Sequence, residues 1–136
     1  MSIVKLNGIA DIQEAKLPPE GRYDLVCLKA DLQEKEGKSS IRLILSVEDT
    51  DENYANLFSY IGLPGPGDDG EKVAQKLLFA KRTLYWLGMD DVIEDGELDL
   101  SALPGCQTRI PIPVVPSEYE GREGRNVNWP NLPTEG

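Results

Sequence analysis

The side chains best suited to chemistry in this chain are aromatic, basic and amide groups, because the sequence contains no histidine. Phe58 and Tyr60 lie in a segment of alternating polar and apolar character, and Tyr119 lies in a segment that contains two glycines. Aromatic rings stack on planar partners, and neighbouring arginine or lysine side chains neutralise phosphates. These residue types therefore indicate binding by stacking and charge rather than catalysis.

Motifs that carry catalysis or hold a cofactor are missing from the sequence. It has no G-x-S-x-G motif, no phosphate-binding loop and no dinucleotide fingerprint. Two cysteines, Cys27 and Cys106, cannot form a zinc site of Cys and His ligands without histidine, and we expect both as buried thiols rather than a disulfide. Carboxylates such as those of Asp49 and Asp51 are suitable ligands for Mg²⁺. Because both residues lie in a polar loop, however, the simpler interpretation is that they are ordinary solvent-exposed side chains. We expect no enzyme activity, metal or cofactor.

Residues 54–63 alternate between two sets of side chains, as a β-strand does. Phe58 and Tyr60 fall on one side of this predicted strand, and aliphatic side chains fall on the other. If the aromatic side faces solvent, it offers a stacking surface for bases. The alternative is that the leader or the helix covers the rings and that they belong to the core. Arg42, on the preceding predicted strand, faces outward beside this region and could contact a phosphate or stack on a base.

Two loops carry further candidate contacts. Lys35 and Lys38 flank the tip of the first predicted hairpin, where neighbouring glutamates balance their charge. The second loop, residues 117–124, contains two glycines and is expected to be a mobile arm with its arginines at the surface. The candidate contacts in and next to it are Tyr119, Arg122, Arg125 and Asn126.

The order of the predicted elements indicates the fold. Hydrophobic alternation predicts five strands, at residues 23–32, 40–47, 54–63, 107–115 and 125–129. A helix capped by Asp68 and ending at Leu87 separates the third strand from the fourth. This β-β-β-α-β-β order is typical of the mainly β, five-stranded barrel called the OB-fold. We expect one OB-fold domain over residues 1–136, with a leader at 1–16 and a loose tail at 131–136.

Local patterns predict which faces are buried. The apolar residues of the leader are expected to pack against the barrel, and those residues are Ile3, Leu6, Ile9 and Ile12. The inward face of the first strand is expected to hold Val26, Leu28, Ala30 and Leu32. Pro111 and Pro113 indicate that the fourth strand is an edge strand or is interrupted. Phe79 and Trp86 lie seven residues apart on one flank of the helix, which leaves open a homo-oligomer through the helix face.

The charge of the chain is −10, which at first argues against a nucleic-acid partner. The distribution is uneven, because residues 1–47 contain seven bases and seven acids, whereas residues 48–71 and 90–99 contain only acids. A binding groove needs local rather than global positive potential. No apolar stretch approaches the roughly 20 residues of a membrane span, and residues 1–8 do not form a signal peptide. We therefore expect a cytoplasmic protein without a membrane partner.

Several short stretches resemble a known family. Their sequences are Leu17-Pro18-Pro19-Glu20-Gly21-Arg22-Tyr23, Phe58-Ser59-Tyr60-Ile61-Gly62-Leu63-Pro64, Leu87-Gly88-Met89 and Glu118-Tyr119-Glu120-Gly121-Arg122-Glu123-Gly124-Arg125-Asn126-Val127. Taken in this order, over about residues 17–130, the chain resembles small bacteriophage proteins of OB-fold type. Those proteins are encoded among replication and recombination genes and are regarded as single-stranded DNA-binding proteins.

The resemblance implies a protein that binds single-stranded DNA in the host cytoplasm during phage replication or recombination, with little sequence preference. Its partners would be the DNA strand and other phage replication or recombination proteins. Bases would stack on the aromatic candidates, and the basic candidates would neutralise phosphates. The alternative from another class is an OB-fold protein-interaction module, either an acidic DNA mimic or a virion component.

Overall fold

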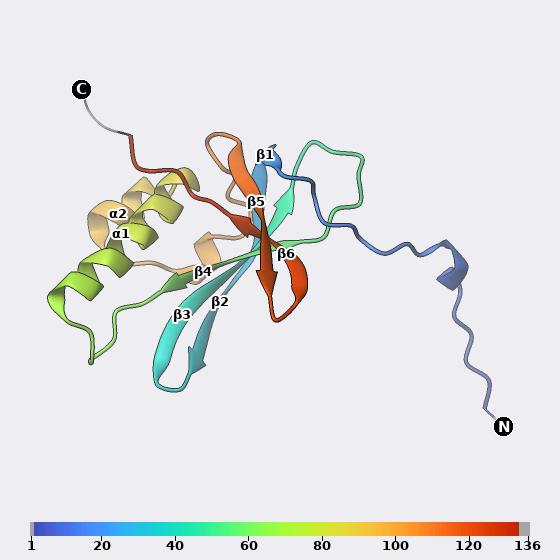
Figure 1. Ribbon diagram of the computed structural model, residues 1–136, viewed down its shortest axis with the longest axis horizontal. Helices are drawn as coiled ribbons and strands as arrows, with labels where there is room; N and C mark the ends of the chain where they lie inside the picture. Colours follow the sequence, from blue (N-terminus) through green and yellow to red (C-terminus); the bar gives the residue numbers. More distant parts are fainter. Residues whose placement is uncertain (1, 134–136) are drawn as a thin grey trace.

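Antiparallel β-strands form most of the regular structure in the computed structural model, which describes residues 2–133 (Figure 1). The strands are β1 (Gly21–Tyr23), β2 (Leu25–Lys35), β3 (Lys38–Val47), β4 (Leu57–Gly62), β5 (Ile112–Tyr119) and β6 (Arg122–Val127). The helices are α1 (Gly70–Trp86) and α2 (Asp90–Asp95), with 3-10 turns η1 (Ile9–Asp11) and η2 (Leu100–Ala102). The prediction of a mainly β fold is confirmed. The predicted helix between the third and fourth predicted strands is also present, as α1 between β4 and β5.

The strands form two three-stranded sheets, in the orders β2-β3-β4 and β1-β5-β6. Only Asp24 separates β1 from β2, so one bent segment of the chain contributes a strand to each sheet. For this reason the structure has six strands where the sequence predicted five. On the other side β4 lies close to β6, but no strand ladder joins the two sheets there within residues 2–133. The sheets are therefore not hydrogen-bonded into a closed barrel.

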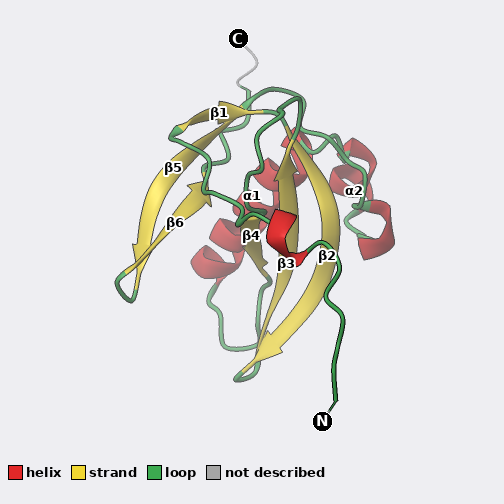
Figure 2. Ribbon diagram, turned by 90° about the vertical axis from the view of Figure 1, so that its right-hand side faces the viewer, coloured by secondary structure: helices red, strands yellow, loops and turns green. Residues whose placement is uncertain are grey.

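The core lies between the two sheets and α1 (Figure 2). Its members include Leu25, Cys27, Leu43, Leu45, Leu57, Ile61, Leu84, Leu87, Leu103, Ile112, Val114 and Trp129. Alternation explains the burial pattern of β3 and β4, because every second residue of these strands points inward. Both cysteines are free thiols, as predicted, but only Cys27 is buried and Cys106 is half-buried. Burial raises the pKa of the Cys27 thiol. No helix within the described residues is long and apolar enough to cross a membrane.

A β-bulge changes the predicted inward face of the first strand. The register between β2 and β3 shifts between Cys27 and Lys29, which leaves Leu28 as an extra residue. An inserted residue reverses the alternation from that point. Before the bulge Leu25 and Cys27 point inward and are buried, so Val26 lies on the other face, and Leu28 is 48% exposed. After the bulge Ala30 and Leu32 pair with the inward residues Leu43 and Ile41, so Ala30 packs against the core, while Leu32, at the open end of the sheet, is 50% exposed. The predicted inward face is therefore wrong for Val26 and Leu28, but Ala30 and Leu32 lie on it.

Helix α1 begins one residue later than predicted and buries a different flank. Its N-cap is Asp69, whereas the predicted cap, Asp68, accepts a hydrogen bond from the backbone N–H of Gly65 at 2.8 Å. Trp86 is 8% exposed and belongs to the core, while Phe79 is 37% exposed. The two residues therefore do not share a free flank, because the helix packs against the sheets through its C-terminal half.

Strand β5 lies between β1 and β6, so the proline segment is not an edge strand. The other alternative, an interrupted strand, is confirmed, because Gln107 forms an isolated bridge to Val26 and β5 begins only at Ile112. Pro113 lies near the start of β5, and its carbonyl accepts a hydrogen bond from the backbone N–H of Asn128, just after β6 ends. The N–H that proline lacks points to the same side of the strand as this carbonyl. The missing donor therefore falls at the end of the β5–β6 ladder, where it interrupts little.

The predicted loop at residues 117–124 is a tight hairpin. Tyr119 pairs with Arg122, which leaves a two-residue turn of Glu120 and Gly121. Both turn residues have positive φ, 50° and 78°, as the turns that fit the strand twist require. The first hairpin, between β2 and β3, is built in the same way around Glu36 and Gly37. The expected mobile arm is therefore an extension of β5 and β6.

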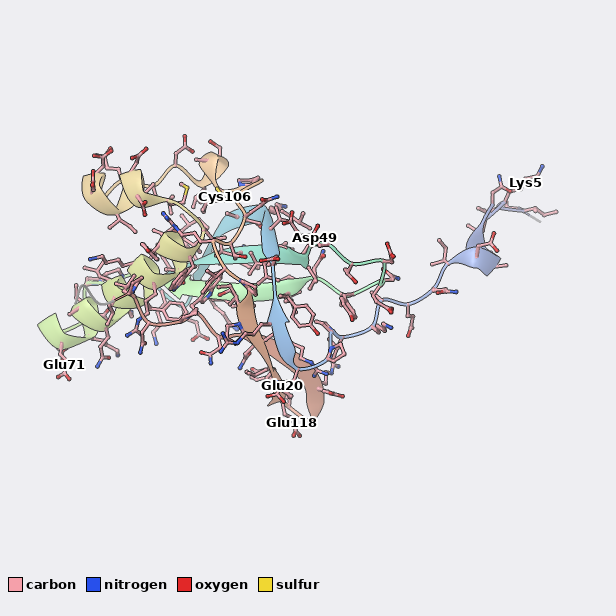
Figure 3. The ribbon with its side chains drawn as sticks, turned by 90° about the horizontal axis from the view of Figure 1, so that it is seen from above. Lys5, Glu20, Asp49, Glu71, Cys106 and Glu118 are labelled. Carbon is pink, nitrogen blue, oxygen red and sulfur yellow. The ribbon has the colours of Figure 1, made fainter. Side chains whose placement is uncertain are left out.

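The leader does not pack on the sheets as predicted. Residues 2–15 run away from the body of the molecule, and η1 buries none of its residues (Figures 1 and 3). Ile3, Leu6, Ile9 and Ile12 are between 61% and 85% exposed. The first contacts with the body are the Gln13 carbonyl, which accepts a hydrogen bond from the Asn53 amide at 3.5 Å, and Lys16, whose backbone pairs with the segment around Tyr54. Residues 134–136 of the predicted loose tail, like Met1 of the leader, lie outside the described residues.

Candidate nucleic-acid interface

The outer face of the β2-β3-β4 sheet carries two rows of side chains that run across the strands. In one row Ile44 of β3 is opposite Lys29 of β2 and Phe58 of β4. In the next row Arg42 is opposite Asp31 and Tyr60. Directly opposite residues lie about 5 Å apart, so each ring has a basic side chain in its own row. The sheet therefore positions rings and cations together.

Phe58 and Tyr60 are uncovered, which decides between the two interpretations that the sequence left open. Their side chains are 48% and 54% exposed, while Leu57, Ser59 and Ile61 between and beside them are buried. The backbone below the rings is fixed, because the buried Ser59 hydroxyl accepts a hydrogen bond from the indole N–H of Trp129 at 2.9 Å. The two rings thus form an exposed, rigidly supported aromatic pair.

A hollow of about 510 Å³ lies beside the pair and is called here the aromatic groove. It lies between β4, β6 and α1, and its lining comprises Phe58, Ser59, Tyr60, Phe79, Val115, Asn126, Val127 and Asn128. The groove has no charged side chain in its lining, and its two amides can donate to or accept from a base edge. The structure thus places Asn126 beside the aromatic pair, whereas the sequence analysis placed it only next to the loop at residues 117–124.

Two residues of the aromatic groove were missed by the sequence analysis. Asn128 lies two positions after Asn126 and therefore on the same side of the strand. The spacing of two residues could have predicted that Asn128 lies beside Asn126. The sequence analysis considered only the glycines, the arginines, Tyr119 and Asn126 of this segment. Phe79 was assigned to a helix flank, and nothing in the local sequence indicates that α1 brings it beside β4.

A second hollow, of about 380 Å³, lies at the turn end of the β2–β3 hairpin and is called here the basic hollow. Three lysines line it, Lys35 and Lys38 from the hairpin and Lys76 from α1, together with Glu36. Gly62, which also lines it, is the next residue after Tyr60 on the outer face of β4. The basic hollow and the aromatic groove therefore follow one another along β4.

Lys76 is fixed in the basic hollow by an ion pair. Its ammonium group donates a hydrogen bond to the Asp68 carboxylate at 2.7 Å and another to the carbonyl of Leu63 at 3.3 Å. The bond from Lys76, with a second from the backbone N–H of Gly65, lowers the pKa of Asp68. Asp68 thus ties the start of α1 to the end of β4.

Replacement of this carboxylate has a pH signature. A carboxyl group whose pKa is lower in the folded state stabilises the fold at pH values above its ordinary pKa. We therefore expect Asp68→Asn to lower the melting temperature at neutral pH. As the pH falls below the ordinary carboxyl range and through the lowered pKa of Asp68, the difference from the parent should disappear. Thermal melts of both proteins across that range measure it, and a difference that grows towards acid would contradict the ion pair.

The β5–β6 hairpin carries the most exposed aromatic candidate. Tyr119 is 77% exposed and lies opposite Arg122 at the turn. Arg122 is also exposed. The turns of the β2–β3 and β5–β6 hairpins both lie at the lower side of the molecule in two perpendicular views (Figures 1 and 2). Lys35, Lys38, Tyr119 and Arg122 thus project to the same side, but Tyr119 and Arg122 do not line the aromatic groove.

Arg125 has a structural role, and the expectation that it lies at the surface is wrong. Its side chain is only 10% exposed. The guanidinium donates hydrogen bonds to the carbonyl of Pro18 at 2.7 Å and to Glu123 at 2.9 Å. Because β1 brings the Pro18 segment alongside β5 and β6, this arginine is enclosed by residues far away in the sequence. It positions β6 rather than offering a charge to a ligand.

Arg42 is partly engaged within the sheet. It donates a hydrogen bond to Asp31 at 2.8 Å, and Lys29 lies 3.8 Å from the same carboxylate. Arg42 and Lys29 together carry two positive charges, and Asp31 balances only one of them. The Nε atom of Arg42 is buried and has no hydrogen-bond partner among residues 2–133. Lys29, whose side chain is 62% exposed, is a further basic candidate that the sequence analysis left out.

The acids of residues 48–56 and of α2 lie away from these hollows, whereas Asp68 pairs with Lys76 of the basic hollow. Residues 48–56 form the β3–β4 loop at the upper right of Figure 1, and α2 lies at the far left. Neither segment lines the aromatic groove or the basic hollow. Acidic side chains remain at the hairpin turns as well, where Glu34, Glu36, Glu118, Glu120 and Glu123 accompany Lys35, Lys38 and Arg122.

No protein-family model matches this chain, and a search of curated proteins found no match.

Proposed function

We propose that this protein binds single-stranded DNA without catalysis and with little sequence preference. The observation that carries the proposal is the exposed aromatic pair, Phe58 and Tyr60, on a sheet face that also presents Lys29 and Arg42. Every base has a flat face, so stacking on exposed rings tolerates any sequence. The bases of duplex DNA are already stacked on one another and are not free to stack on a protein ring. A site that binds by stacking therefore favours unpaired strands.

The fold supports the proposal through its strand order. Around the molecule the neighbours run β2, β3, β4, β6, β5 and β1, with β1 and β2 as two parts of one segment. We infer from this order that the fold is an open OB-type barrel. In that interpretation β3 and β4 are strands 2 and 3, and the two hairpins are the loops that flank the usual ligand face.

The proposed path of the strand follows the outer face of β4. Phosphates lie against Lys35 and Lys38 in the basic hollow, and bases lie on Phe58 and Tyr60 and extend into the aromatic groove. The amides of Asn126 and Asn128 contact base edges, and the β5–β6 hairpin closes the path with Tyr119 and Arg122. Replication or recombination of phage DNA is the setting that the family resemblance adds to this proposal.

Binding should depend on salt, but only weakly for a DNA-binding protein. Each neutralised phosphate on a single strand contributes about −0.7 to the slope of log K against log[salt]. The exposed basic side chains on the proposed path are Lys29, Lys35, Lys38 and Arg122. We therefore expect a slope of about −3. Fluorescence anisotropy with an oligo-dT strand at several salt concentrations measures it.

The same titration separates the proposal from a protein-interaction module. A hairpin duplex of equal length should bind clearly more weakly than oligo-dT, and an RNA strand tests the sugar preference. Absence of binding at the lowest salt concentration would reject the proposal and favour the interaction module. Equal affinity for duplex and single strand would also reject it, because stacking on the aromatic pair would then have no part in binding.

A further inference from the structure

The N-terminal arm, residues 2–15, presents an apolar sequence to solvent. Five of its side chains are between 61% and 85% exposed, and these are Ile3, Val4, Leu6, Ile9 and Ile12. Single exposed apolar residues are ordinary, but a run of this density marks an interaction site. The arm contacts none of the core, since its first backbone pairing to the body is at Lys16.

An apolar groove of about 350 Å³ lies between α1, α2 and the ends of β3 and β4. Its lining includes Ile61, Leu63, Leu77, Leu84, Ile93 and Leu98. Leu77 is 54% exposed although it lies on the same helical stripe as the buried Leu84. The apolar stripe of α1 is therefore covered in its C-terminal half and open in its N-terminal half. The volume falls within the range of pockets that hold a ligand.

The arm and the apolar groove lie at opposite ends of the molecule. In Figure 1 the two helices are at the left and the arm leaves at the right. Figure 3 gives the same arrangement from above, with Lys5 at one end and Glu71, in the first turn of α1, at the other. The arm of one molecule is therefore directed away from its own groove and towards whatever lies beyond the other end.

The charges of the two surfaces are complementary. Lys5 lies between Val4 and Leu6 and is the only charged residue in the first ten of the sequence. The groove is bordered on the α2 side by carboxylates, of which Asp95 and Glu97 flank the groove residue Gly96. On the α1 side a single base, Lys81, lines it. The outer part of the arm, residues 3–9, is apolar with one lysine and thus matches an apolar groove with an acidic edge, whereas Asp11 and Glu14 lie in the part of the arm nearer the body.

We propose that the N-terminal arm of one molecule binds in the apolar groove of a second copy. Such a contact joins two different surfaces, so each pair keeps one free arm and one free groove, and further copies can add. The contact is separate from the proposed nucleic-acid interface. Self-association in the absence of nucleic acid therefore tests the arm–groove contact by itself. If the protein does not self-associate, the proposed binding of single-stranded DNA is unaffected.

The first test is sedimentation of the full chain in the absence of DNA. The weight-average mass should rise above that of the monomer as the concentration increases. Ile3→Ser with Leu6→Ser in the arm, or Leu77→Gln in the groove, should each weaken association about tenfold or more, because each removes a large apolar side chain from the contact. Leu78→Gln is the matched control, since Leu78 is 42% exposed on the same helix but does not line the groove.

The second test identifies the two surfaces and the copies that supply them. A Leu6→Cys protein is mixed with a Leu77→Cys protein and oxidised, and the mixture should form a disulfide-linked heterodimer. A protein that stays monomeric at all concentrations overturns the proposal. Association that the arm and groove variants leave unchanged also overturns it, as does a Leu6→Cys/Leu77→Cys double variant that forms its disulfide only within one chain.

Discussion

Replacing Phe58 and Tyr60 together with alanine is expected to weaken binding of single-stranded DNA by about 30-fold or more. Each base stacked on an aromatic ring contributes about 1–3 kcal/mol, and a loss of 2 kcal/mol corresponds to about 30-fold in the dissociation constant. The rings are neighbours on one face of β4, so their effects need not add exactly. Anisotropy titrations of oligo-dT with the parent, both single variants and the double variant measure the loss.

The design must separate a lost stack from a damaged fold. Both rings are about half exposed, so their removal should lower the free energy of unfolding by no more than about 1 kcal/mol each, the span of strand propensity. Phe58→Leu and Tyr60→Leu keep an apolar side chain but lose the flat ring, and they should bind as weakly as the alanine variants. Leu78→Ala, outside the proposed path, should bind like the parent. Full binding by the double alanine variant would show that the rings are not the stacking surface.

Much of the architecture was predictable because it depends on short-range periodicity. The alternation around Phe58 and Tyr60 placed both rings on one face of β4, and the exposed fractions confirm it. Likewise the Gly37 turn and the helix between the third and fourth strands follow from local sequence signals. What alternation alone could not decide is which face of the strand is covered, since that depends on distant segments.

The errors share a physical cause, which is dependence on a distant partner. The bulge at Leu28 exists only in the pairing of β2 with β3, so the sequence of one strand does not reveal it. Arg125 is enclosed by the Pro18 carbonyl, which is 107 residues away along the chain. A charged residue beside glycines looks exposed until the partner that buries it is known. The leader shows the opposite error. The spacing of its apolar residues predicted that they would be buried against the barrel, but no part of the fold covers them.

The candidate site was predicted in part for the same reason. Phe58, Tyr60 and Arg42 fall on adjacent strands, where local patterns suffice to place them on one face. Asn126 was proposed from its loop, yet it reaches the aromatic groove because β6 lies beside β4. That approach is a tertiary contact, and it also explains why Asn128 and Phe79 were left out. The face was thus predictable and the groove beside it was not.

Trp129→Ala is expected to have the largest effect on stability, a loss of about 3–5 kcal/mol in the free energy of unfolding. The indole is 6% exposed, and it fills the core directly after β6. Denaturant titrations analysed by linear extrapolation measure the change. Tyr119→Ala is the matched control, because it removes an aromatic side chain that is 77% exposed and should change stability by no more than about 0.5 kcal/mol.

A double-mutant cycle then isolates the hydrogen bond from the packing. Trp129→Phe keeps an aromatic ring but leaves the buried Ser59 hydroxyl without its donor, which costs about 1–3 kcal/mol. Adding Ser59→Ala removes the hydroxyl, so the double variant should be more stable than Trp129→Phe alone. Because Ser59 lies between Phe58 and Tyr60, the Trp129→Phe variant should also bind oligo-dT more weakly than the parent while it remains folded. Equal affinity would mean that this bond supports the core of the protein but does not hold the aromatic pair in place.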